Sequence, residues 1–412
     1  MSPQFAKTDH LPFWRHYYRS DRRAGCLSSS LSARAGERIG RLHHGVCDLG
    51  SKAAWAEGIV NLRIGFLGTG LIAWAHSLAL KAMKDSGIVD VSIEACFDSD
   101  ANRSSGFASI QGCSAKDSPG EVLDAVDAVW ICTSTAAHRE LVALACEKGV
   151  AVFCEKPLGR NLEEATAIGD LVAASGIPAQ VGLVLRSCPV FRSLEAVIGS
   201  GEFGRLMAIS LRDDQFFPIQ GHYGSTWRAD VSKAGGGTVI EHSIHDLDIL
   251  RFCVDVPATI SATTSCFSGY EGIEDSAVAS ISFEGGASGV LVSTWHQILS
   301  RPSTRRVEAI FESGIVWFED DFTGPMHIIN DAGNEVRVCD SPDWVTELPL
   351  SKDEIGLAIR MYAAADRGFV DALMAGKAPS PSIAEGVFAH KLVEAVYASA
   401  RGGGVPIDPR SL

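Results

Sequence analysis

The sequence lacks long hydrophobic runs. No apolar stretch reaches the roughly 18 to 20 residues that a membrane helix needs, and the amino terminus has no apolar signal-peptide core. Cysteine pairs of the C-x-x-C type are also missing, because the 11 cysteines are scattered singly. This pattern predicts no zinc site and no redox dithiol. We therefore expect a cytoplasmic protein, in a reducing compartment and without a membrane partner.

The chain has fewer basic residues than acidic ones, 36 against 50. The formal net charge is -14 and the isoelectric point is about 5.3. Nucleic-acid binding depends on lysine and arginine that neutralise phosphates, so we expect no nucleic-acid partner. The negative balance is typical of a protein that acts on neutral small molecules.

The first sixty residues differ from the remainder. They hold nine Lys and Arg against five acids, and a serine-rich patch lies at Ser28 to Ser32. An organelle transit peptide is one interpretation, although such peptides are usually poorer in acids. The alternative that we favour is a poorly ordered, dispensable extension over residues 1–59, or sequence translated from a start codon placed too early.

The rest of the chain divides into two expected domains. With 412 residues and 46% hydrophobic content, the chain exceeds the size at which a single core stops growing. From residue 60 to 184, short apolar runs alternate with amphipathic stretches, which predicts β-α units and a doubly wound parallel sheet. The expected strands are Leu62–Leu67, Val91–Phe97, Ala128–Cys132, Val150–Cys154 and Ala179–Val184.

The pattern changes over residues 185–412. A helix near Pro189–Ile198 and a strand at Leu206–Asp214 precede a glycine triplet and another helix, and two helices end the chain. Between Ala258 and Val338, period-two strands joined by turns predict an α+β domain with a large, mostly antiparallel open sheet. The expected strands there are Ala277–Phe283, Ser288–Trp295, Arg305–Phe311 and Ile315–Phe318.

A dinucleotide fingerprint follows the first strand. The segment Gly68-Thr69-Gly70-Leu71-Ile72-Ala73 has the pattern G-x-G-x-x-A and leads into a helix. The first glycine permits a tight turn, the second admits a pyrophosphate close to the backbone, and the phosphates lie on the helix amino terminus. We therefore expect residues 68 to 72 to bind a dinucleotide.

The second strand ends at Asp98, where a carboxylate would meet the adenosine ribose hydroxyls of NAD. A carboxylate there repels the additional phosphate of NADP, so NAD is expected and NADP is disfavoured. Ser99 and Arg103 keep NADP open, because they can grip a phosphate. Asp98 is alternatively a helix cap, a role that Asp100 can share.

The segment Phe153-Cys154-Glu155-Lys156-Pro157 resembles the E-K-P motif of the glucose-fructose oxidoreductase and inositol dehydrogenase family (Gfo/Idh/MocA). The likeness spans essentially residues 60 to 410, and further matches are Ile131-Cys132-Thr133, His138, Gly182, Arg186, Pro189, Gly235 to Asp248, Glu274-Asp275 and Leu392 to Ser399. The resemblance implies an oxidoreductase with a Rossmann domain. It also implies cofactor contacts from Thr133, Ser134, His138, Glu155 and Lys156, a homodimer or homotetramer formed through the open sheet, and no metal.

Lys156 is the first expected catalytic residue. It follows a strand of a parallel sheet, so it lies at the carboxyl edge, where such sheets bind ligands. An ammonium there can donate a hydrogen bond to the reacting oxygen. A cis Lys156-Pro157 bond is one way to aim the side chain.

The helix after the glycine triplet carries the second catalytic element. Glu241, His245 and Asp248 are spaced i, i+4 and i+7, which predicts one shared helix face. In the resemblance, His245 matches the general acid/base, and Glu241 matches an acid that is usually aspartate, one methylene shorter. An unperturbed imidazole pKa near 6.5 suits that proton step. His242 is expected to be structural, and a metal site among these residues is disfavoured.

One segment departs from the family pattern, and three further residues are candidates for the substrate pocket. Thr133-Ser134-Thr135 stands where relatives usually have T-P-N, which preserves backbone contacts to the cofactor but not those of asparagine. Arg186, Trp227 and His296 are candidates for lining a substrate pocket, and a structural role competes for each. Of these, Arg186 and Trp227 join Lys156, Glu241 and His245 in the expected substrate-binding set.

Together these features predict an NAD-dependent dehydrogenase of a sugar, cyclitol or related derivative. Alternatives are a reductase that acts in the opposite direction, an NAD-dependent glycosidase, or a non-catalytic dinucleotide-binding regulator. Retention of both Lys156 and His245 favours catalysis, because a regulator needs neither.

Overall fold

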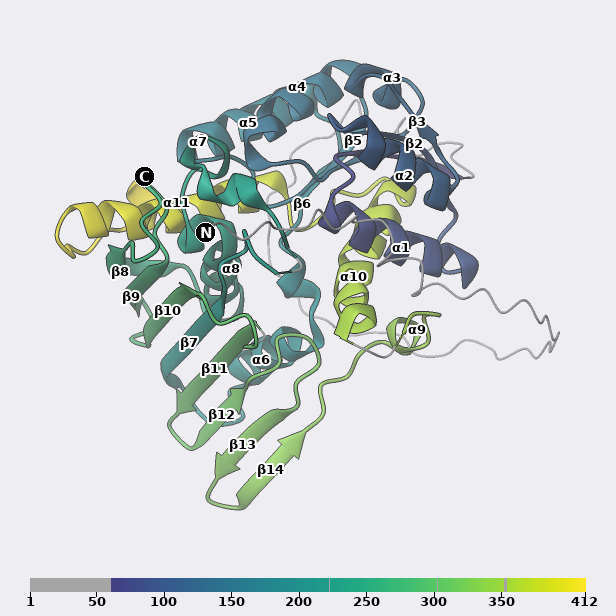
Figure 1. The fold of residues 1–412 in the computed structure, drawn as a ribbon. Helices are drawn as coiled ribbons and strands as arrows, with labels where there is room; N and C mark the ends of the chain where they lie inside the picture. Colours follow the sequence, from purple (N-terminus) through teal and green to yellow (C-terminus); the bar gives the residue numbers. More distant parts are fainter. Residues whose placement is uncertain (1–60, 222, 302, 352–353) are drawn as a thin grey trace, which may run out of the picture.

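The computed structural model describes residues 61–221, 223–301, 303–351 and 354–412 (Figure 1). The extension expected over residues 1–59 lies outside the described residues. Within the described part of the chain, no helix is both long enough and apolar enough to cross a membrane.

Six strands form a parallel sheet in the order β3-β2-β1-β4-β5-β6. The strands are β1 (Leu62–Leu67), β2 (Val91–Phe97), β3 (Ser114–Ala115), β4 (Ala128–Ile131), β5 (Ala151–Cys154) and β6 (Ala179–Val181). This order, which reverses direction between β1 and β4, is that of a Rossmann fold and confirms the predicted architecture. The last predicted strand is too long at its end, because Val184–Ser187 forms a 3-10 turn (η4).

Helices bury both faces of this sheet, which explains why its strands are continuous apolar runs. Trp130 and Phe153 face one core, whereas Val129 and Val152 face the other. The first face is covered by α1 (Leu71–Asp85), α2 (Ala101–Gln111) and α10 (Glu354–Met374), and the second by α3 (Pro119–Leu123), α4 (His138–Lys148) and α5 (Leu162–Ser175).

Helix α10 comes from the far end of the sequence but packs beside α1 (Figure 1). Its residues Ala363, Phe369 and Val370 belong to the same buried core as Trp130 and Phe153. The first sheet is therefore completed by a segment that follows the second sheet in the chain. The domain boundary near residue 184 remains a prediction, and α10 packs on the first domain although it lies beyond that boundary.

Eight strands form the second sheet in the order β14-β13-β12-β11-β7-β10-β9-β8. They are β7 (Leu206–Phe216), β8 (Pro257–Ser265), β9 (Ser276–Phe283), β10 (Ser288–His296), β11 (Thr304–Phe311), β12 (Gly314–Phe318), β13 (Met326–Asn330) and β14 (Gly333–Arg337). Every pair except β7 with β10 is antiparallel, which confirms a mostly antiparallel sheet. The hairpin of β13 and β14 had not been resolved into strands by the sequence pattern.

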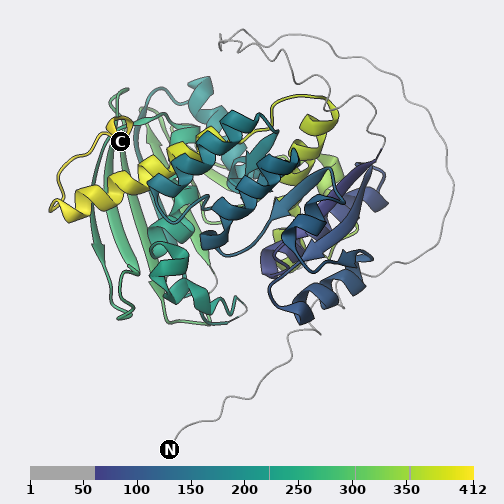
Figure 2. The same ribbon diagram turned by 90° about the horizontal axis from the view of Figure 1, so that it is seen from above.

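One face of this sheet packs on α6 (Pro189–Ser200), α8 (Ile244–Cys253) and α11 (Ile383–Arg401). Helix α11 contacts β8, α8 and α5, so it bridges the two halves (Figures 1 and 2). Short segments complete the fold: η3 (Thr135–Ala137), η5 (Thr226–Ala229), α7 (Val231–Ala234), the π-helix η6 (Val239–Ser243), α9 (Asp343–Thr346) and η7 (Pro409–Ser411).

Candidate active site

The glycine loop has the geometry that a pyrophosphate requires. Gly68 has a φ of +85°, and a Cβ built on it would lie 2.7 Å from the carbonyl carbon of Cys132. Gly70 precedes α1, and a Cβ there would meet no atom within 4 Å. No side chain caps α1, and no acid lies in its first turn. The backbone N–H groups of Leu71 and Ile72 are therefore placed to receive an anion, and the loop fits NAD.

Asp98 lies directly beside this loop. Its Oδ2 accepts hydrogen bonds from Thr69 N (2.8 Å) and Thr69 Oγ1 (3.1 Å), and its Oδ1 accepts one from Asp100 N (2.9 Å). Asp100, rather than Asp98, caps α2 through a hydrogen bond from Asn102 N. The capping alternative therefore belongs to Asp100, and the carboxylate of Asp98 lies against the glycine loop.

His138 braces two backbone segments instead of facing open space. Its Nδ1 is 3.0 Å from Pro157 O and its Nε2 is 3.4 Å from Thr133 O. Burial lowers the pKa of His138, so the ring is neutral and donates to only one carbonyl, the nearer Pro157 O. The cofactor contact expected of His138 has no support in this arrangement. The residue instead fixes the loop that carries Lys156.

Lys156 lies at the carboxyl end of β5, and its bond to Pro157 is cis. Its ammonium donates a hydrogen bond of 2.6 Å to Glu241 O and forms no ion pair with a carboxylate in the described part of the chain. Burial lowers the pKa of Lys156, the charge of Glu241 opposes that effect, and Arg228 adds to it. The ammonium therefore retains N–H donors for an oxygen of a ligand.

Glu241 is buried, with 2% of its surface exposed, and both of its carboxylate oxygens are engaged. Oε1 accepts a hydrogen bond from Thr135 Oγ1 (3.2 Å), and Oε2 pairs with Arg228 Nε (2.8 Å). The longer side chain thus connects the loop after β4 to the Arg228 segment. These contacts favour an orienting role for Glu241, the second of the two possibilities that its additional methylene had left open.

His245 carries a buried nitrogen without a hydrogen-bond partner. Its side chain is buried, and its Nδ1 has no hydrogen-bond partner among the residues that the structure describes. Burial, followed by the charges of Lys156 and Arg305 and by His242, lowers the pKa of His245 well below 6.5. The value of an unperturbed imidazole pKa therefore does not apply to this buried ring. The ring is a neutral imidazole that can accept a proton and hold it only briefly.

Glu241, His245 and Asp248, which were predicted to share one helix face, fall in two consecutive helical elements. Glu241 lies in the π-helix over Val239–Ser243, whereas His245 and Asp248 lie in α8. Asp248 pairs with Arg186 at 2.7 and 2.5 Å, and the same guanidinium also binds Glu385. Arg186 is thus saturated by two carboxylates and ties α8 to α11. Its expected role in substrate binding has no support in these contacts.

His242 belongs to a buried charge cluster. Arg305 donates to its Nε2 (3.1 Å), and its Nδ1 is 2.7 Å from Asp213 Oδ2. Arg305 also pairs with Asp246 (2.7 Å) and Asp321 (2.6 Å). Burial, with a contribution from the charge of Asp213, raises the pKa of Asp246 to about 6. These contacts are consistent with the structural role predicted for His242.

The remaining sequence candidates are less engaged. Trp227 is half-buried, and the guanidinium of Arg228 stacks 4.4 Å above its ring. Thr133 Oγ1 is buried without a partner among the described residues, and no hydrogen bond between described residues involves the side chain of Ser134. His296 lies 3.6 Å from Asp214 at the end of β10. Of these, Trp227 and Ser134 each adjoin in sequence a residue that contacts Glu241, namely Arg228 and Thr135.

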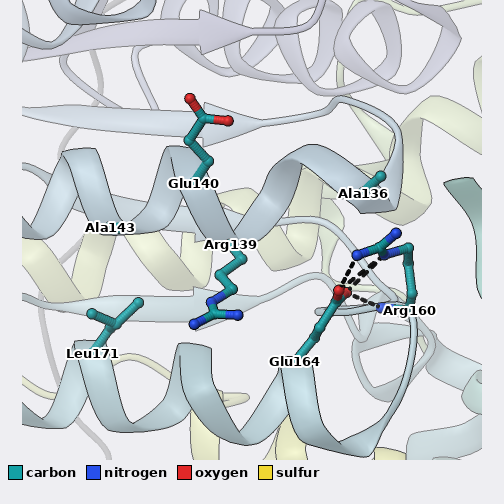
Figure 3. A pocket seen from close by; sticks show the side chains of 7 residues that line it. All are labelled: Ala136, Arg139, Glu140, Ala143, Arg160, Glu164 and Leu171. Carbon is teal, nitrogen blue, oxygen red and sulfur yellow. Dashed lines mark hydrogen bonds and ion pairs between the residues drawn. The ribbon is translucent and has the colours of Figure 1, made fainter. Parts of the chain in front are cut away.

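A separate groove opens between α4 and α5 on the outside of the first domain. Figure 3 shows that Arg160 and Glu164 point at one another across it, while Glu140 points away from this pair. None of the expected catalytic or cofactor residues lines this groove. It is distinct from the site at the carboxyl edge of the sheet.

His76 and Asp366 were not predicted from the sequence, although they lie next to the E-K-P segment. His76 Nε2 is 3.0 Å from Glu155 Oε1, and its Nδ1 is 2.6 Å from Asp366 Oδ1. The available signal was a polar residue inside an otherwise apolar helical pattern in both α1 and α10, because each of the two is fully buried. Glu155, expected at the cofactor, instead directs its carboxylate to His76.

Comparison with known proteins agrees with this geometry. A family model described as oxidoreductase family, NAD-binding Rossmann fold, matches residues 62–183, and the GFO/IDH/MocA C-terminal domain matches residues 191–316. A myo-inositol 2-dehydrogenase of Thermotoga maritima is 30% identical over 241 residues, which are 56% of this chain and 67% of that protein.

Other relatives match over shorter segments. A 1,5-anhydro-D-fructose reductase of Ensifer adhaerens is 33% identical over 39% of this chain and 48% of its own length. An inositol 2-dehydrogenase of Rhizobium meliloti is 29% identical over 50% and 59%. The chain thus spans about half the length of these curated relatives.

Solved structures share the fold. A levoglucosan dehydrogenase in complex with NADH and levoglucosan superimposes with a TM-score of 0.74 at 22% identity, covering 84% of this chain and 99% of that one. An oxidoreductase from Agrobacterium radiobacter in complex with NAD+, L-tartaric acid and magnesium has a TM-score of 0.72 at 21% identity, with coverage of 85% and 99%. Together with the family models, these matches show that the chain belongs to the Gfo/Idh/MocA family of oxidoreductases and that its first domain is an NAD-binding Rossmann fold.

Proposed function

We propose that the protein is an NAD-dependent dehydrogenase of a secondary alcohol on a sugar, a cyclitol or a related derivative. The observation that carries the proposal is the pairing of a buried ammonium, Lys156, with a buried, unpaired and neutral imidazole, His245, beyond the carboxyl edge of the Rossmann sheet. Relatives named as inositol dehydrogenases support the substrate class.

The chain's own residues perform the proton chemistry. His245 accepts the hydroxyl proton, because its ring is neutral and a neutral imidazole has a nitrogen lone pair that can take a proton. Lys156 donates a hydrogen bond to the same oxygen and stabilises the negative charge that develops as the proton leaves. Bound NAD supplies the hydride acceptor. The products are the ketone, NADH and a proton that His245 releases.

Glu241 and Arg228 act around these two groups. Since the carboxylate of Glu241 is occupied by Thr135 and Arg228, we assign it to orienting its neighbours, while its backbone oxygen holds the Lys156 ammonium. Asp98 supports NAD over NADP. The reverse reaction, reduction of a ketone, uses the same residues, and the relative named as a reductase favours testing it.

The test is a panel of cyclitols, aldoses and anhydrosugars with NAD, followed by NADH absorbance. We expect turnover of at least one member, and Lys156→Met is expected to lower kcat by roughly 10² to 10³. NADH binding, measured by fluorescence, is expected to survive in that variant. Turnover that Lys156→Met leaves unchanged would contradict the mechanism.

We propose a homodimer or homotetramer formed through the outer face of the second sheet. Four exposed apolar residues lie on strands β9, β10, β11 and β13 of that sheet: Val278, Val290, Ile310 and Ile329. An apolar surface of this kind is typical of a protein interface. Light scattering of Val290→Glu against the wild type is expected to show a smaller particle.

We also propose that the protein works in the cytoplasm. The nine cysteines of the described residues are all free thiols, which a reducing compartment preserves. Fractionation of cells that express the full chain tests this placement.

A further inference from the structure

A chain of buried charges joins three distant segments beneath the candidate active site. Asp366 on α10, His76 on α1 and Glu155 at the end of β5 are linked by contacts of 2.6 and 3.0 Å. Trp130 Nε1 donates a further hydrogen bond of 2.9 Å to Asp366 Oδ1. His76 and Asp366 are fully buried, and Glu155 is nearly so. The chain ends at the residue that precedes Lys156.

His76 is the cation of this chain. Burial alone would lower the pKa of His76, but the carboxylates of Asp366 and Glu155, one on each ring nitrogen, raise it to about 9. The ring therefore donates an N–H to both carboxylates at neutral pH. Charged hydrogen bonds of this kind fix geometry more strongly than neutral ones.

Glu155 connects His76 to the backbone of Lys156. Its Oε2 accepts a hydrogen bond from Lys156 N (3.2 Å), while its Oε1 faces His76. Gly182 leaves the required space, since a Cβ there would lie 2.5 Å from Glu155 Oε1. His138 holds Pro157 O on the following residue. The backbone on either side of the Lys156 side chain is thus held by one histidine directly and by another through Glu155.

We propose that His76 is a positioning residue of the oxidoreductase reaction: through Glu155 it fixes the backbone from which the Lys156 ammonium reaches the reacting oxygen. The inference rests on the proposed role of Lys156. It adds that α10, at the far end of the sequence, sets the position of the catalytic lysine through Asp366. Its physical basis is that displacement of a reacting group by about 1 Å can cost on the order of 10² in rate.

The experiment compares His76→Gln with the double variant His76→Gln/Asp366→Asn in the full chain. The single variant leaves two buried carboxylates without their cation, and the double variant leaves one. We expect kcat to fall roughly 10-fold to 100-fold in the single variant, with KM for NAD little changed, and to recover in part in the double variant.

His390→Gln is the matched control. His390 is also a buried histidine, but burial lowers its pKa to about 3, so glutamine replaces a neutral ring without a change of charge. Its Nε2 accepts a hydrogen bond from Gly159 N (3.4 Å), and the amide oxygen of glutamine can accept the same bond. We expect this variant to keep the kcat of the wild type. The ¹⁵N resonances of His76 are expected to show an imidazolium up to about pH 8.

A substrate-free measurement separates this inference from the proposed function. Lys156 is acylated with a small amine-reactive reagent, such as an activated ester, and the product is followed by peptide mass spectrometry. The rate of acylation is expected to increase in His76→Gln and not in His390→Gln. If no panel member is turned over by the wild type, the proposed function fails while this measurement still decides the inference. Unchanged acylation and kcat in a folded His76→Gln, an equal loss in His390→Gln, or a His76 that titrates below pH 6.5 would overturn it.

Discussion

Replacing Gly182 by alanine probes the space that Glu155 needs. The new Cβ would lie 2.5, 2.9 and 3.2 Å from the Oε1, Cδ and Oε2 atoms of Glu155. The backbone of Gly182 is not left-handed, so this clash is the principal effect. The carboxylate has to move by about 1 Å, which takes it out of hydrogen-bond range of His76. Breaking a buried ion pair in this way costs about 3 to 5 kcal/mol.

For a chain of this size we expect Gly182→Ala to lower Tm by roughly 4 to 7 °C in differential scanning calorimetry. We also expect a lower kcat, since Lys156 loses its restraint. Gly368→Ala is the control, because a Cβ at that position of α10 would meet no atom within 4 Å. Alanine stabilises exposed helix positions, so this control is expected to match or slightly exceed the wild type. A Gly182→Ala protein with wild-type Tm and kcat would refute the reasoning.

Three further outcomes are expected. Asp98→Ser removes the carboxylate beside the glycine loop, and steady-state kinetics should show the NADP-to-NAD ratio of kcat/KM rising roughly tenfold, equivalent to about 1.4 kcal/mol; a ratio that stays constant would count against the ribose contact. Arg186→Gln leaves Asp248 buried without its cation, so urea unfolding should show a loss of about 3 to 5 kcal/mol, whereas a rise confined to substrate KM would restore its role in binding. The pKa of His76 is raised from 6.5 to about 9, so its stabilisation, about 3 kcal/mol, is fully present below pH 6.5 and disappears as the pH rises through 9; chemical denaturation of the wild type and His76→Gln across that range should converge at the alkaline end.

The sequence predicted the Rossmann half well because each strand is buried on two faces. A run such as Ala128 to Cys132 is apolar at every position, which leaves little choice of structure. The glycine loop was equally predictable, since Gly68 requires a positive φ and Gly70 an open approach. These features depend on residues close together in the chain, so the sequence pattern is enough to predict them.

The candidate site was less predictable because its contacts are not local. Asp366 and His76 are 290 residues apart, and no sequence pattern near either residue indicates that the other is its partner. The π-helical turn that carries Glu241 was not predicted, because such a turn depends on packing and not on residue spacing. Arg186 looked like a pocket residue in sequence, but its carboxylate partners lie on two helices that come together only in the folded chain.

The position of α10 has a consequence for how the protein is made. When β6 leaves the ribosome, Trp130 and Phe153 on one face of the first sheet still lack Phe369, because α10 ends about 190 residues further along the chain. At a translation rate of about 5 to 20 residues per second, α10 is synthesised roughly 10 to 40 s after β6. The cofactor-binding half therefore completes its folding only near the end of synthesis. A chimera that exchanges this half between relatives needs to carry Glu354–Met374 with it.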